Sequence, residues 1–166
     1  MVLKDALLPE YDHEMGTTRR LLERVPDTDL GWKPHEKSMT FGRLAMHLAE
    51  LPQWASVVVD RISFDLEAPR TSPAEATSCG ELLAAFDTNV AHARSQIAAR
   101  TDAELLANWT LRRGAYELFT LPRIAVMRSL VMNHSIHHRG QLSVYLRLRD
   151  IPLPAMYGPT ADEGGF

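Results

Sequence analysis

Residues 122–149, PRIAVMRSLVMNHSIHHRGQLSVYLRLR, predict the longest helix of the chain and, through it, the class of the fold. Proline is tolerated in the first turn of a helix, and Thr120 stands before it as a plausible N-cap. At ~1.5 Å per residue the helix would be about 40 Å long, and the segment 150–152 would end it. One face has side chains at steps of three and four residues that an amphipathic helix would bury: Met127, Val131, His134, His138, Leu142 and Tyr145.

Two amphipathic patterns in the first half of the chain predict two more helices. The first covers residues 5–25 and stops before a proline. The second covers residues 41–64 and follows Thr40, a plausible N-cap. Pro52 lies inside this second pattern and lacks a backbone donor. We therefore expect a kink near residues 47–48 rather than a helix end.

A fourth helix is predicted between the second helix, over residues 41–64, and the C-terminal helix. Ser78 and Glu81 have the spacing of a capping box, and an apolar stripe continues from there to Ile97. Residues 109–119 suit two short extended segments, on a weaker pattern. Four amphipathic helices with short or medium connections predict an all-α fold, a four-helix bundle, which we expect to be a single domain over residues 1–166.

The composition is typical of a globular protein, with 45% hydrophobic and 23% charged residues. A net charge of −3 and the lack of a basic stripe argue against a nucleic-acid partner. No run approaches the ~18 apolar residues of a membrane span, and the acidic segment 1–14 does not resemble a signal peptide. The single cysteine, Cys79, fits a cytoplasmic location and excludes a cysteine-based metal site.

Three histidines occupy positions that would otherwise be apolar. His134 and His138 are one helical turn apart, so both imidazoles can reach one ion. His47 replaces a core position in the second predicted helix and could supply a third ligand from a facing helix. The alternatives are hydrogen-bonded core histidines or a solvated cluster, because His137 also shares a face with His134. Spacing alone does not bring His47 beside the other two.

Two segments carry a resemblance to a known family. Residues 133–163, NHSIHHRGQLSVYLRLRDIPLPAMYGPTADE, closely resemble the C-terminal signature of the DinB-like (DinB/YfiT) metal-binding family, and residues 32–54, WKPHEKSMTFGRLAMHLAELPQW, resemble its second-helix motif. The resemblance implies a four-helix bundle of DinB/YfiT-like topology that pairs as a homodimer. It also implies that His47, His134 and His138 are metal ligands, which selects His138 over the neighbouring histidine.

The resemblance also suggests a chemistry. Three neutral imidazoles suit zinc, nickel or other late first-row ions, and three protein ligands leave a coordination position for water or substrate. Relatives in the family include bacillithiol S-transferases and mycothiol-dependent isomerases, which implies a low-molecular-weight thiol as co-substrate and a metal-dependent S-transferase acting on an electrophilic small molecule. A hydrolase using metal-activated water and a non-enzymatic, metal-binding stress-response protein are the alternatives.

Four other side chains are candidates for supporting roles, although no catalytic residue can be assigned. Glu50 and Gln141 each lie three residues after a predicted ligand and could accept a proton from a ligand ring. Solvated or helix-pairing side chains are the alternative for both. Arg139 is a candidate for binding an anionic substrate group, with an ordinary surface arginine as the alternative. Tyr11 could line the pocket, although its pattern favours the core. The remaining histidines are predicted to lie on the surface: His13, His35 and His92.

Overall fold

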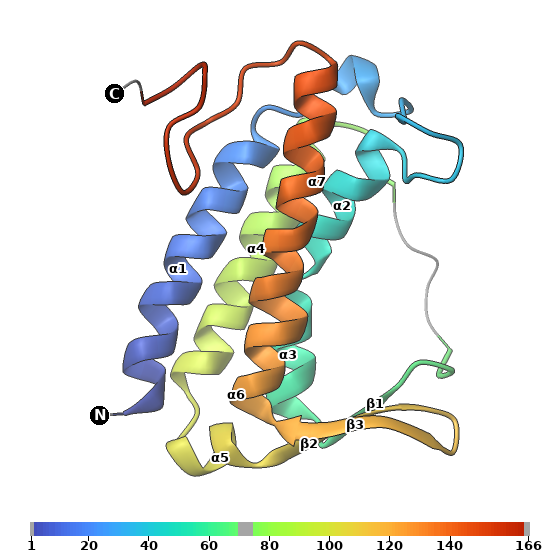
Figure 1. Cartoon of the computed structure of the whole chain (residues 1–166). Coiled ribbons are helices and arrows are strands. Elements are labelled where there is room, and N and C mark those ends of the chain that lie inside the picture. Colours follow the sequence, from blue (N-terminus) through green and yellow to red (C-terminus); the bar gives the residue numbers. More distant parts are fainter. Residues whose placement is uncertain (1, 70–74, 165–166) are drawn as a thin grey trace.

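The computed structural model describes residues 2–69 and 75–164, and its longer helices lie side by side (Figure 1). These helices are α1 (Leu3–Leu22), α2 (Phe41–Glu50), α3 (Gln53–Asp60), α4 (Cys79–Ala98) and α7 (His134–Leu148). Both α1 and α2 contact both α4 and α7, and α3 also packs on α4. Their apolar faces meet in one core that includes Tyr11, Phe86 and Leu142. Among the described residues, no helix combines the length and apolar character needed to cross a membrane.

Local signals place the ends of α1 and α4 close to where the structure has them. α1 begins two residues before the predicted range 5–25. It ends three residues before the end of that range, because the chain tightens into single turns ahead of Pro26. α4 begins directly after Ser78, whose Oγ accepts the backbone N–H of Glu81 at 3.1 Å. The predicted N-cap is therefore confirmed. The reciprocal bond of a capping box is not present between these two described residues, because the Glu81 carboxylate instead accepts from the backbone N–H and hydroxyl of Thr77.

Pro52 interrupts the second helix instead of only bending it. The backbone N–H of Leu51 still donates to the His47 carbonyl at 3.1 Å, but Pro52 has no N–H to continue the ladder. The next two bonds, from the Trp54 N–H to the Leu51 carbonyl and from the Ala55 N–H to the Pro52 carbonyl, each span only three residues. This tight turn separates α2 from α3. The kink expected near residues 47–48 is wrong in position, since the break falls beside the proline.

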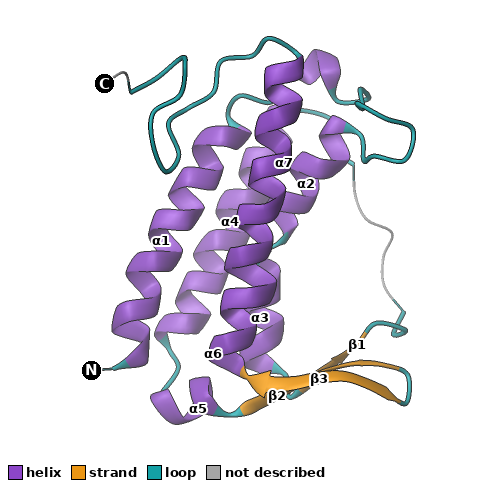
Figure 2. Cartoon of the chain, viewed as in Figure 1, coloured by secondary structure: helices purple, strands orange, loops and turns teal. Residues whose placement is uncertain are grey.

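A small sheet lies across one end of the helices, near α5 (Asp102–Leu106) (Figure 2). Its strands are β1 (Ser63–Asp65), β2 (Asn108–Arg113) and β3 (Tyr116–Pro122), with β1 parallel and β3 antiparallel to the central β2. The two extended segments predicted within 109–119 are confirmed. The all-α class is wrong in this respect, and so is a helix extending to residue 64. Trp109 of β2 is fully buried and belongs to the same hydrophobic core as the helices. Gly114 joins β2 to β3 with a φ of +56°, a conformation that favours glycine.

The C-terminal helical segment begins as predicted but is not uniform. It comprises α6 (Arg123–Val126), a π-helical segment η2 (Met127–Asn133) and α7. Thr120 is not its cap, because it lies in β3 with its hydroxyl 2.6 Å from that of Thr110, and Pro122 occupies the cap position. A π-helix has more residues per turn than an α-helix, and buried side chains recur here in two pairs five residues apart, Val126 with Met127 and Val131 with Met132. A sequence periodicity of three and four could not reveal this wider turn.

Candidate metal centre

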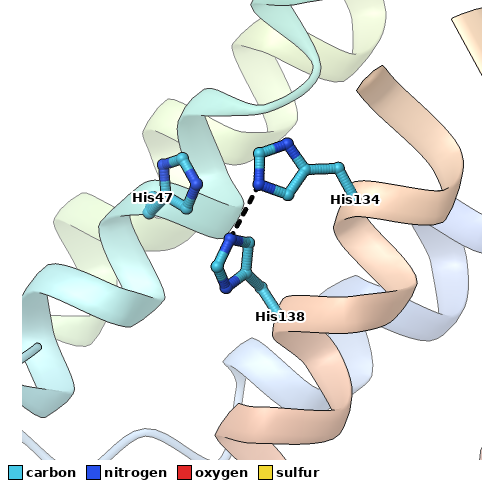
Figure 3. Close-up of side chains that lie close together, drawn as sticks. All are labelled: His47, His134 and His138. Atoms are coloured by element: carbon cyan, nitrogen blue, oxygen red, sulfur yellow. Dashed lines mark hydrogen bonds between the residues drawn. The ribbon is translucent and has the colours of Figure 1, made fainter. Parts of the chain in front are cut away.

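Three histidines from two helices lie together, with His47 on α2 and His134 and His138 at the start of α7 (Figure 3). The Nε2 atoms of His134 and His138 are 2.8 Å apart. The His47 ring lies 5.2 Å from the His134 ring and 4.5 Å from the His138 ring, measured between centroids. One ring nitrogen from each residue falls within 4.8 Å of the others. The structure thus brings together the three residues singled out in the sequence.

Burial keeps these three imidazoles neutral near pH 7. His138 is 6% exposed, and the other two are partly buried. Desolvation is the largest cause that lowers the pKa of all three rings. The pKa of His47 falls to about 4, because the neighbouring His138 and His134 and the charge of Arg43 add to this effect. Neutral rings present the lone pairs that a metal ion requires.

Both candidate ligands in α7 have a partner on the same C-terminal helical segment. The Nδ1 of His138 lies 2.7 Å from the amide Oε1 of Gln141, so Nδ1–H donates to that oxygen. The Nε2 lone pair of His138 then accepts the hydrogen bond from Nε2–H of His134, a proton that a bound ion would displace. Gln141 therefore contacts a candidate ligand ring, and its role beside a bound ion stays a prediction. The backbone carbonyl of Leu130, in η2, interacts with the His134 ring and partly opposes the lowering of its pKa. Such contacts orient metal-binding imidazoles in other proteins.

The geometry fits a metal ion of the late first row. Two ligand nitrogens around a tetrahedral zinc ion lie about 3.3 Å apart when each Zn–N distance is about 2.0–2.1 Å. The Nε2 atoms of His134 and His138 would need to separate only slightly from 2.8 Å. The three ligand nitrogens lie within 4.8 Å of one another, so the His47 ring would also need to move toward the other two. Within residues 2–69 and 75–164, no carboxylate or cysteine joins this group. The three histidines could therefore hold an ion as an all-nitrogen set.

The structure gives Glu50 a different partner from the one expected. Its Oε2 accepts a hydrogen bond from Nη1 of Arg43 at 3.1 Å, and both side chains are less than one-third exposed. Arg43 lies one turn before His47 on α2, and its charge contributes to the lowering of the His47 pKa. Sequence reasoning missed Arg43, although its spacing of four residues from His47 was a usable signal.

Two other candidates do not lie where a substrate would meet the histidines. Arg139 is 1% exposed and pairs with Glu14 of α1, so both the substrate-binding and the surface expectations are wrong. Tyr11 is fully buried in the core, and its hydroxyl lies 3.5 Å from the Val90 carbonyl oxygen. The histidines predicted to lie on the surface are exposed, namely His13, His35 and His92. His137 is also exposed.

Comparisons with known proteins match this fold and nearly the whole chain. The family model described as the DinB superfamily matches residues 10–142. The uncharacterized protein YrdA of Bacillus subtilis (strain 168) is 25% identical over 162 residues, covering 96% of this chain and 90% of that protein. A DinB-like protein from Bacillus cereus ATCC 10987 shares the fold with a TM-score of 0.73 and 20% identity, over 94% of this chain and 98% of the other. A second, YjoA from Bacillus subtilis, has a TM-score of 0.67 and 20% identity, over 90% and 96%. The protein belongs to the DinB superfamily.

Proposed function

We propose that the chain binds one divalent ion, zinc or nickel, through His47, His134 and His138, and that it is an enzyme using a low-molecular-weight thiol. The favoured reaction is S-transfer. The thiol sulfur forms a bond to an electrophilic carbon, the leaving group departs with its electron pair, and the thiol proton passes to solvent. The observation that carries this proposal is the donor set, three neutral imidazoles without a carboxylate or cysteine among the described residues.

The number of ligands supports a catalytic ion more than a structural one. Structural zinc sites generally use four protein ligands, whereas catalytic sites use three and leave a position for a small molecule. A bound ion of this kind would favour the thiolate form of a thiol, which is the nucleophilic form. His47 and His134 are only partly buried, which supports access from solvent. A purely structural ion would be better served by a sealed site.

The chain's own residues contribute orientation and charge. Gln141 holds His138 in the tautomer whose Nε2 lone pair faces His134. Since all three candidate ligands are neutral, the full charge of a divalent ion would remain to stabilise an anionic sulfur. An undiminished positive charge favours a thiol, which binds as an anion, over a neutral substrate.

A hydrolase is the second candidate, and the carboxylate of Glu50 is the observation that favours it. A general base must reach the water that it deprotonates. Glu50 lies three residues after His47, but it accepts a hydrogen bond from Arg43 at 3.1 Å. It would have to leave this ion pair to act as a base, so we rank hydrolysis below S-transfer.

The test is a turnover assay of the zinc- or nickel-loaded protein. Bacillithiol, mycothiol and glutathione are each offered with a chlorinated aromatic electrophile, and thioether formation is followed by mass spectrometry. Parallel reactions without thiol contain a nitrophenyl ester to detect hydrolysis. We expect thioether formation that His134→Ala abolishes. Ester cleavage alone would move the proposal to hydrolysis, and inactivity in both assays with a stably bound ion would favour a non-enzymatic metal-binding role.

Two further expectations come from the family rather than from the site. We infer that α1, the α2–α3 pair, α4 and α7 form the four-helix bundle of DinB/YfiT-like topology, and that the protein pairs as a homodimer. The contacts of α1 and α2 with both α4 and α7 support the first inference. Light scattering coupled to size-exclusion chromatography measures the mass of the particle and so tests the second.

A further inference from the structure

Arg139 follows His138 directly in α7 but faces a different helix. Consecutive residues lie about 100° apart around a helix axis. The His138 ring therefore faces His47 of α2, whereas the Arg139 guanidinium meets Glu14 of α1. Arg139 is 1% exposed and is among the largest fully buried side chains of the protein. A buried charge requires partners within the chain, because water cannot solvate it.

Those partners lie on α1 and on the C-terminal tail. Nη2 of Arg139 donates to the Glu14 carboxylate at 2.6 Å, and Nη1 donates to the Glu14 backbone carbonyl at 2.9 Å and to the Thr18 hydroxyl at 3.1 Å. Tyr157, in the tail, donates its hydroxyl proton to the same carboxylate at 2.6 Å. The guanidinium also lies 4.8 Å from the centre of the Tyr157 ring. The side chain is thus held from several directions at once.

We propose that Arg139 is a positioning residue for the metal centre, whose clamp on α1 sets the rotation of α7 that turns His134 and His138 toward His47. This inference rests on the proposed function in one respect, namely that the three histidines bind an ion. Metal–ligand distances tolerate errors of only about 0.2 Å. A small rotation of α7 about its own axis would move both of its ligands away from His47 together.

The chemistry of arginine suits this task. Its planar guanidinium donates in two directions in a fixed geometry, so it can bind a carboxylate and a backbone carbonyl at the same time. A lysine keeps the charge but lacks that rigid fork. Buried ion pairs often add little to stability compared with apolar residues of the same size. An orienting role gives a physical reason for a buried charge next to a candidate ligand.

The experiment compares Arg139→Lys with a matched control, Arg123→Lys. Arg123 lies at the other end of the same helical segment and donates to the backbone carbonyls of Val58, Arg61 and Glu104. Both substitutions remove a multidentate arginine and both should lower the melting temperature. Purified apo-protein is titrated with Co²⁺ well below that temperature, and its visible absorption reports affinity and coordination geometry. We expect Arg139→Lys to weaken binding by about tenfold or more and to shift the spectrum, with Arg123→Lys unchanged in both.

Three outcomes have separate meanings. Equal Co²⁺ affinity and identical spectra in Arg139→Lys and Arg123→Lys would overturn the positioning role while leaving the metal site intact. Failure of the unsubstituted protein to bind Co²⁺ would instead overturn the proposed function itself, and the positioning role with it. Should Arg139→Lys not fold, Tyr157→Phe replaces it, because this change removes one hydroxyl from a residue that is 62% exposed. A weaker affinity in Tyr157→Phe supports the role, and an unchanged one contradicts it.

Discussion

Two faces of α7 both bury polar side chains, but they satisfy them in different ways. On the face toward α1, Arg139 meets a carboxylate, a carbonyl and two hydroxyls, so its charge is matched within the chain. On the face toward α2, the rings of His134 and His138 direct their Nε2 atoms at each other, and His47 stands opposite. A matched cluster is typical of a structural contact. A gathering of neutral nitrogen donors is typical of a cation site.

Replacing a histidine on the face of α7 toward α2 should reduce metal content more than any substitution on the face toward α1. His134→Ala removes one of the three candidate ligands, and two imidazoles hold an ion far more weakly than three. Elemental analysis should find about one metal per chain in the unsubstituted protein and almost none in the variant. The exposed His13→Ala is the control and should keep its metal. Retention of the ion in His134→Ala would remove the distinction between the faces.

Breaking the cluster on the α1 face should instead cost stability. Glu14→Ala leaves the Arg139 charge buried without its carboxylate, which should lower the free energy of unfolding by about 3–5 kcal/mol. Urea denaturation of the metal-free protein measures this loss. Asp12→Ala, two residues earlier on α1, breaks an exposed ion pair with Arg94 and should cost less than about 1 kcal/mol. Similar losses in the two variants would show that the buried cluster is no more important than a surface pair.

Gln141 should affect metal affinity through the tautomer of His138. Gln141→Ala removes the acceptor 2.7 Å from Nδ1 of His138, on an exposed side chain. We expect metal affinity to fall about 10- to 100-fold, while the unfolding free energy of the metal-free protein changes by less than about 0.5 kcal/mol. Competition with a chromophoric chelator measures the affinity. A fall in stability without a fall in affinity would assign Gln141 a structural role.

The smallest effect concerns pH. The pKa of His47 is lowered from 6.5 to about 4 in the folded protein, so between these values the unfolded chain binds more protons. Stability is then fully present above pH 6.5 and is lost as the pH falls toward 4. From pH 7.5 to 5.5 the metal-free protein should lose about 1 kcal/mol through this group. Urea denaturation at the two pH values tests this, with His47→Ala as the control that should show a smaller loss. A loss of the same size in the control would exclude His47 as the cause.

Much of the candidate site lies within reach of sequence reasoning because it is local. The pairing of His134 with His138 and the contact of His138 with Gln141 both follow from helical steps of three and four residues. The cap at Ser78 is equally local. Thr120 shows the limit of such reasoning, since a residue that could cap a helix lies instead in a strand that pairs with residues earlier in the chain.

By itself, the sequence determined that His134 and His138 share a helix face, which residue caps α4, and which family the chain resembles. Each of these depends on neighbours within a few residues or on a linear pattern. Only the tertiary structure decided that His47 lies against α7, that Glu50 pairs with Arg43, and that Arg139 is buried on α1. The physical reason is that a helix presents several faces, and what each face meets depends on how the other helices pack around it.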